Sequence, residues 1–128
     1  MVSIKKTESM VDRESALKIL RTVPSPEAFL FFTDVGQYLS ELAPSLREFY
    51  EKLKKIPLKS IEFHFERGDF ERWIRKTLGD EYLADRISKI GKSTKQEELR
   101  TTIQRIVERR LSQLEETVTT KPSKGTVR

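Results

Sequence analysis

Apolar residues recur at helical spacing along most of this chain. One stripe predicts a first helix from about 13 to 22, which Pro24 and the next proline end. The last stripe is the longest, because residues 95–118 contain neither Gly nor Pro and their apolar positions step by three and four. The pattern therefore predicts a mainly α, compact multi-helix domain with a long C-terminal helix.

Residues 28–42 give a more ambiguous pattern. A β-prone aromatic run from Ala28 to Phe32 precedes Thr-Asp-Val-Gly, and Gly36 can supply the positive φ of a tight turn. A short hairpin is favoured, which would make the fold α+β. A helix interrupted at Gly36 is the alternative.

Two Gly-Asp pairs divide the middle of the chain into short helices. Gly68 and Gly79 can adopt the left-handed conformation that ends a helix, and Asp69 and Asp80 can each cap the helix that follows. Residues 61–66 also alternate as in a strand, but the stop and start signals belong to helices. The expected helices span 58–67, 70–78 and 81–90.

A basic edge is expected near a helix that Ser45 and Glu48 open as a capping box. Residues 45–60 hold five cations against two anions, and residues 119–128 add three cations without an acid. This concentration indicates a surface for phosphate backbones, and a merely solvated face is the alternative. The candidate nucleic-acid contacts are Lys52, Lys54, Lys55, Lys59, Lys121, Lys124 and Arg128.

The composition fits a single domain with polar ends. The 128 residues can bury a core without staples, and the lack of cysteine excludes a disulfide scaffold, thiol catalysis and cysteine-ligated zinc. The pattern separates a flexible leader (1–10), a single helical domain (11–118) and a disordered basic tail (119–128). Because there is no long apolar run, we expect a cytoplasmic protein without a membrane partner.

The long C-terminal helix suggests self-association. It would extend on the order of 36 Å, more than a small domain needs to cover its core. We therefore expect a homodimer whose interface contains Leu111, Leu114 and Val118. A helix that packs along its own domain is the alternative.

The chain offers little catalytic chemistry. His64 is the only histidine, no second ligand stands at metal-binding spacing, and no nucleotide-binding or nucleophile motif occurs. We expect no catalytic residue, no metal site and no cofactor.

A structural motif surrounds His64 instead. We expect His64 to hydrogen-bond and pin the turn at Gly68, next to Arg67, with Asp69 as a helix cap. Trp73 stands at helical spacing with apolar neighbours and is expected in the core. The cations near Trp73 leave open an exposed platform for stacking bases.

The chain resembles a small archaeal domain family of unassigned function over about residues 27–116. The similar segments are FLFFTDVGQYL, APSLREFYEKL, KSIEFHFERGDFERWIRKTLGDEYLADRI and EELRTTIQRIVERRLSQL. The hallmark matches His64, residues 67–70, 73–74, 78–80 and 83–84. Similar segments accompany larger enzymes, so the resemblance implies a docking or structural role and no catalytic motif.

We therefore expect a non-enzymatic binding protein. The favoured partner is RNA or the ribosome, with the protein acting as a homodimeric factor that bridges or silences ribosomal particles. The alternative is a protein-interaction or regulatory module that docks on an enzyme. An enzyme using His64 and Asp69 is the least favoured reading.

Overall fold

The computed structural model describes residues 10–119 and is mainly α-helical with a small sheet. The fold class predicted from the sequence is confirmed, including the hairpin and the long last helix. In chain order the elements are α2 (Arg13–Leu20), η1 (Ser25–Glu27), β1 (Phe29–Asp34), β2 (Gln37–Ala43), α3 (Leu46–Leu53), α4 (Leu58–Arg67), α5 (Asp69–Trp73), η2 (Ile74–Leu78), α6 (Glu81–Ser88) and α7 (Gln96–Thr119). The predicted leader and tail fall almost wholly outside the described residues.

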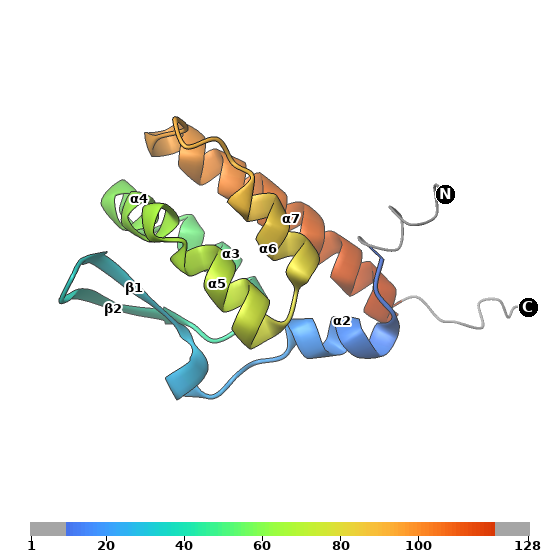
Figure 1. The fold of residues 1–128 in the computed structure, drawn as a ribbon. Coiled ribbons are helices and arrows are strands. Elements are labelled where there is room, and N and C mark those ends of the chain that lie inside the picture. The colour runs from blue at the N-terminus through green and yellow to red at the C-terminus, as the bar shows by residue number, and fades with distance from the viewer. Residues whose placement is uncertain (1–9, 120–128) are drawn as a thin grey trace, which may run out of the picture.

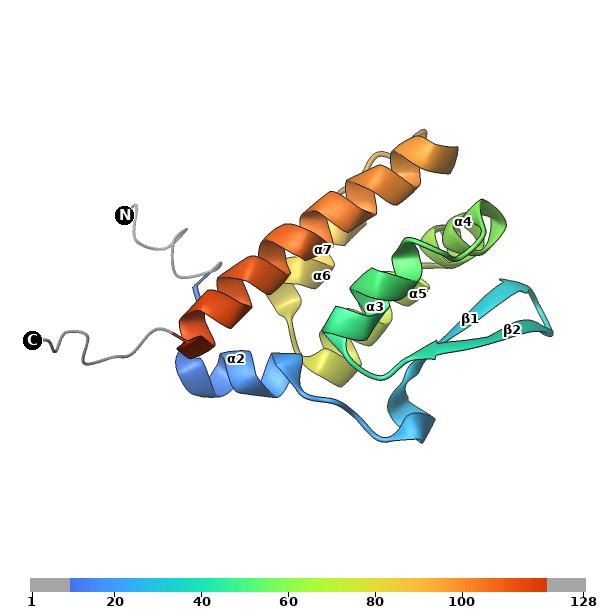
Figure 2. The ribbon, with the colours of Figure 1, turned by 180° about the vertical axis from the view of Figure 1, so that it is seen from behind.

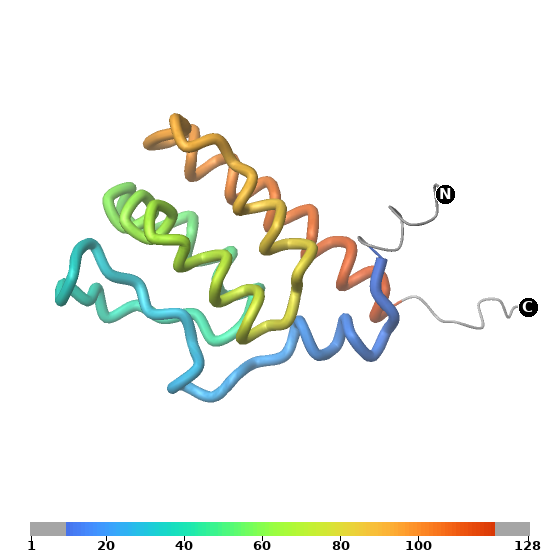
Figure 3. Tube along the Cα trace, viewed as in Figure 1, coloured from blue at the N-terminus to red at the C-terminus, as the bar shows by residue number. Residues whose placement is uncertain are grey.

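The elements form three layers (Figures 1 and 2). The β1–β2 hairpin lies on one side, α3, α4 and α5 form the middle, and α6 and α7 lie together on the other side. Helix α2 packs across the end of α7, and the tube in Figure 3 shows the first and last described segments meeting there. The Nε of Arg13 donates to the carbonyl of Val118 at 3.0 Å, which joins the two segments.

Aromatic rings fill the space between the hairpin and the middle helices. Their centroids lie 4.9 to 6.0 Å apart, mostly in edge-to-face or tilted pairs. Because these rings come from β1, α3 and α5, the hairpin is part of the core. The cluster comprises Phe29, Phe31, Phe49, Phe70 and Trp73.

The hairpin is antiparallel and irregular. Gly36 has φ +76° and supplies the turn, as predicted. The pairing shifts on both sides of Phe32, and Ser40 in β2 has φ +63°, a conformation that a side chain rarely adopts. The irregular part of β1 packs against α4.

Most predicted helix ends are confirmed. Gly68 and Gly79 have φ +76° and +87° and end α4 and the π-helical turn η2, which continues α5. The Ser45 hydroxyl accepts from the amide of Glu48, and the Asp80 carboxylate accepts from the amide of Leu83.

Asp80 also forms a buried ion pair with Arg110 of α7. Its two oxygens accept from Nε and Nη2 of Arg110 at 2.8 and 3.0 Å, and both side chains are at most 2% exposed. The guanidinium lies 4.7 Å from the centre of the Tyr82 ring. The Asp80 carboxylate therefore caps the N-terminus of α6 and also binds α7 through Arg110.

The exposed stripe expected on α7 is not present. Leu111 and Leu114 are 1% and 0% exposed within the chain's own core, and Val118 packs partly against it. Leu111 and Leu114 cannot form a dimer interface, because α7 packs along its own domain against α2, α3, α4 and α6 and buries both side chains there. The homodimer itself and the part of Val118 in it stay predictions. The alternative stated above holds for this helix.

Candidate functional site

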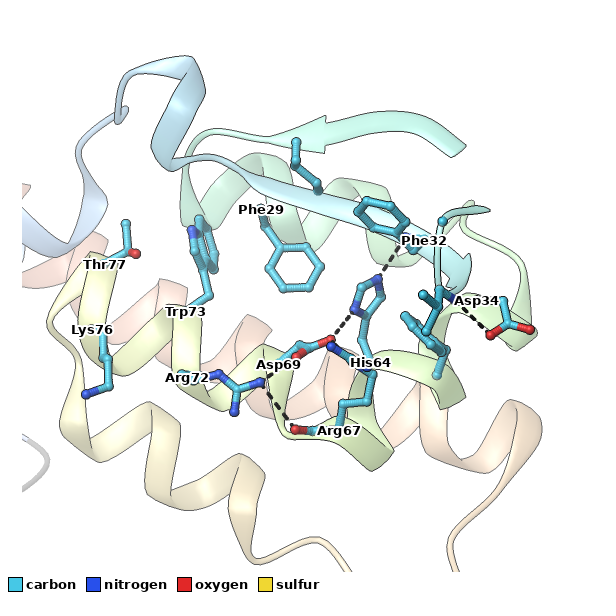
Figure 4. A pocket seen from close by; sticks show the side chains of 14 residues that line it. Phe29, Phe32, Asp34, His64, Arg67, Asp69, Arg72, Trp73, Lys76 and Thr77 are labelled. Atoms are coloured by element: carbon cyan, nitrogen blue, oxygen red, sulfur yellow. Dashed lines mark hydrogen bonds and ion pairs between the residues drawn. The ribbon is translucent and has the colours of Figure 1, made fainter. Parts of the chain in front are cut away.

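A hollow of about 570 Å³ opens between β1 and the helices α4 and α5. Figure 4 shows it from close by, with β1 on one side and the helical side chains on the other. Phe29, Leu30, Phe63 and Trp73 contribute apolar surface, and the hairpin turn at Val35 lies at one end. We call this hollow the hairpin groove.

Three cations follow the helical side of the hairpin groove. Arg67 ends α4, Arg72 lies in α5 and Lys76 lies in η2, and all three are exposed. We call this row the cation ridge. On the hairpin side, Asp34 is the charged residue that lines the groove.

His64 connects the helices to the hairpin at the centre of the groove. The amide of Phe32 donates to Nε2 of His64 at 2.8 Å, so Nε2 must present its lone pair. Nδ1 therefore carries the proton and donates to Asp69 at 2.8 Å. Burial lowers the pKa of His64, and the Asp69 carboxylate opposes that shift without cancelling it.

Asp69 joins three side chains and is not a helix cap. Its oxygens accept from His64, from Nε of Arg67 at 3.1 Å and from Nη2 of Arg72 at 2.5 Å, and its side chain makes no cap hydrogen bond to α5. The prediction of an N-cap was wrong, because these longer-range donors take the carboxylate. Burial alone would raise the pKa of Asp69, but the hydrogen bonds from His64 and Arg67 hold that pKa below its usual range.

The bonding of His64 leaves little room for acid–base chemistry. One ring nitrogen accepts from a backbone amide and the other donates to a carboxylate, so neither faces the groove as a free base. Within residues 10–119, no cluster of three or more His, Asp or Glu side chains is placed to hold a metal.

Trp73 lies in the core, as predicted. It is 8% exposed, and its Nε1 donates to the carbonyl of Glu27 at 2.8 Å, which ties α5 to the segment before β1. A stacking platform needs an exposed ring face. Trp73 therefore contributes a wall of the hairpin groove and no open platform.

Salt bridges engage part of the predicted basic edge. Lys52 pairs with Glu41, and Lys54 pairs with Glu51 at 3.3 Å. Lys55 and Lys59 are exposed. The three candidates in the tail, Lys121, Lys124 and Arg128, lie outside the described residues.

The sequence reasoning missed the hairpin groove. The residue that could have indicated the groove is Leu30. It is aliphatic, alternates with the buried Phe29 and Phe31, and so faces away from the core. Val35 is exposed and also lines the groove. Tyr38 is exposed on β2 and packs beside Phe32, with ring centroids 5.3 Å apart. Several exposed apolar residues gathered on one two-stranded hairpin are a sign of a contact surface, whereas a single one would not be.

Comparisons with known proteins give one match. The model of a family of unknown function, DUF5752, matches residues 26–126. No curated protein and no solved structure matches the chain. In the described part of the chain, no helix has the length and apolar character needed to cross a membrane.

Proposed function

Because the chain belongs to this family of unknown function, we propose a function from its geometry: it is a non-catalytic binding protein that docks a protein partner in the hairpin groove. One observation is the main support. Within residues 10–119, three of the five large apolar side chains that stand exposed, Leu30, Val35 and Tyr38, belong to the hairpin. Leu30 and Val35 also line the hollow, and exposed apolar residues gathered at a hollow are typical of a contact surface.

The way the hairpin is held supports a docking role. A two-stranded hairpin alone is only marginally stable. Here Phe29 and Phe31 anchor one face in the core, and His64 accepts the amide of Phe32 from the side of the helices. The hairpin therefore presents Leu30 and Val35 from a prepared position, which lowers the entropic cost of binding.

RNA or ribosome association is the second candidate. Its support is the exposure of Lys55 and Lys59, one just after α3 and the other in the first turn of α4. Lys52 and Lys54 are engaged by Glu41 and Glu51, so among residues 10–119 Lys55 and Lys59 are the two candidate lysines that form no ion pair.

Photo-cross-linking tests the proposed function. A photoreactive amino acid replaces Val35, 76% exposed in the hairpin turn, and the control places the same group at the exposed Glu108 on α7. We expect the Val35 position alone to cross-link a defined protein segment in cells. That segment, made as a peptide, should bind the wild type saturably and should lose binding to Leu30→Glu. Cross-links to RNA, or equal cross-links from both positions, would overturn the proposal.

A further inference from the structure

The two walls of the hairpin groove differ in charge. The helical wall carries the three cations of the ridge against the one carboxylate of Asp69, together with the apolar Phe63 and Trp73. The hairpin wall is apolar except for Asp34 near the turn. A ligand lying along the groove therefore meets apolar side chains from both walls and positive charge along the helical side. The groove is complementary to a segment that is apolar on one side and acidic on the other.

The arginines of the cation ridge have N–H donors that Asp69 does not use and that a ligand could bind. Asp69 takes only Nε of Arg67 and Nη2 of Arg72, and a guanidinium has five N–H donors on three nitrogens. Within residues 10–119, the Nη1 and Nη2 of Arg67 and the Nε and Nη1 of Arg72 donate to no other residue. Lys76 forms no ion pair in this part of the chain.

Asp69 fixes the direction of the two arginines. Because both guanidiniums bind the same carboxylate, they stand side by side along the rim instead of sampling many positions. Arg67 also lies 5.0 Å from the centre of the Phe63 ring, which further restricts it.

A second hollow lies on the other side of the cation ridge. It has a volume of about 410 Å³ and shares Arg67, Arg72 and Lys76 with the hairpin groove. Arg75 and Lys92 also line it, as do Glu66 and Glu71, and Arg75 is paired with Glu71, Glu81 and Asp85. This second hollow is therefore of mixed charge, and the cations that it shares with the hairpin groove are those of the ridge.

The chain's own C-terminal residues are unsuitable for the hairpin groove by charge. Residues 120–128 contain Lys121, Lys124 and Arg128 and no acid. They would bring like charge to the cation ridge, which costs binding free energy. A partner of opposite charge fits better than this segment.

We infer that the hairpin groove binds an acidic, amphipathic segment of a protein partner. Its apolar side chains contact Leu30, Phe63 and the edge of Trp73, and its carboxylates pair with Arg67, Arg72 and Lys76. The inference rests on the proposed docking function and adds the chemistry of the partner.

Selection from a random peptide library tests this chemistry. The library is displayed on phage and selected in parallel on the wild type, on Arg72→Gln with Lys76→Gln, and on Arg105→Gln with Arg109→Gln. The second pair removes the same charge from exposed positions on α7 that line neither hollow. Circular dichroism first confirms that each variant is folded.

We expect peptides selected on the wild type to be rich in Asp and Glu together with Leu, Phe or Trp. Synthetic copies should bind the Arg72–Lys76 variant about 2- to 30-fold more weakly, since two partly exposed charge pairs are lost. Their binding to the Arg105–Arg109 variant should stay within about twofold of the wild type.

Three results would overturn the inference. Selected peptides that are apolar without an excess of acid would refute the acidic partner and leave the docking function standing. An equal loss of binding in both charge variants would mean that the cation ridge has no specific role. No enrichment on any variant would refute the inference and the docking function together.

Discussion

Two substitutions of His64 should distinguish the stability that its hydrogen bonds contribute from the stability that its packing contributes. His64→Phe keeps a ring among Phe29, Phe63 and Phe70 but leaves the amide of Phe32 without its acceptor. An unpaired, partly buried amide costs about 1–3 kcal/mol. His64→Ala also leaves a cavity, so its total cost should be about 3–5 kcal/mol, a large part of a typical 5–15 kcal/mol stability.

The same bridge predicts a pH dependence with a definite sign. The pKa of His64 is lowered on folding from its ordinary value of 6.5, so near and below that pH the unfolded chain binds a proton that the folded chain does not. The contribution of His64 to the free energy of unfolding should be fully present above pH 6.5. It should fall as the pH drops below that value, by at most about 1.4 kcal/mol per pH unit. Asp69, whose pKa is also lowered, loses its contribution only as the pH falls below its ordinary 3.8.

Urea unfolding followed by circular dichroism between pH 5 and 8 checks both statements. The wild type should lose stability toward pH 5, and His64→Phe should lose much less over the same range because it has no imidazole to protonate. Equal stabilities of the wild type and His64→Phe at pH 8 would show that the bridge to Phe32 contributes nothing. An unchanged pH slope in the variant would assign the slope to other groups.

Further substitutions test other parts of the structure. Leu111→Glu should yield no folded protein, because it places a charge in the core, and a cooperative melt near the wild-type temperature would refute this. Ser60→Ala should raise stability in urea by about 1 kcal/mol, since the buried hydroxyl has no hydrogen-bond partner within residues 10–119. Ser40→Gly should add up to about 1 kcal/mol by relieving its positive φ, again measured in urea. If the basic edge binds RNA, Lys55→Glu with Lys59→Glu should reduce the salt slope of filter binding by about two, and an unchanged slope would exclude both contacts.

Local signals account for what the sequence predicted well. Gly68 and Gly79 end helices because the backbone there must adopt positive φ, and Ser45 caps α3 through an amide three residues away. Such features depend on neighbours in the chain, so a sequence pattern contains them. The hairpin was predicted for the same reason, through Gly36.

Contacts between distant segments account for what the sequence could not predict. Asp69 has the right type and place for a cap, but His64 and Arg72 bind its oxygens once α4 and α5 meet. The partner of His64 on the other side, the amide of Phe32, lies 32 residues earlier. The stripe containing Leu111 looked unpartnered because periodicity shows that a face is apolar and does not show what covers it.

The ion pair between Asp80 and Arg110 has a consequence for how α7 is positioned. The apolar stripe of a long helix presents similar side chains at every turn, so packing alone discriminates weakly against sliding by one turn, about 5.4 Å. Such a slide would pull Arg110 away from Asp80 and leave two opposite charges buried apart, at a cost of several kcal/mol. The pair therefore fixes the register of α7 against the rest of the domain. Neither residue can be replaced alone without loss, and sequences that change one should change the other with it.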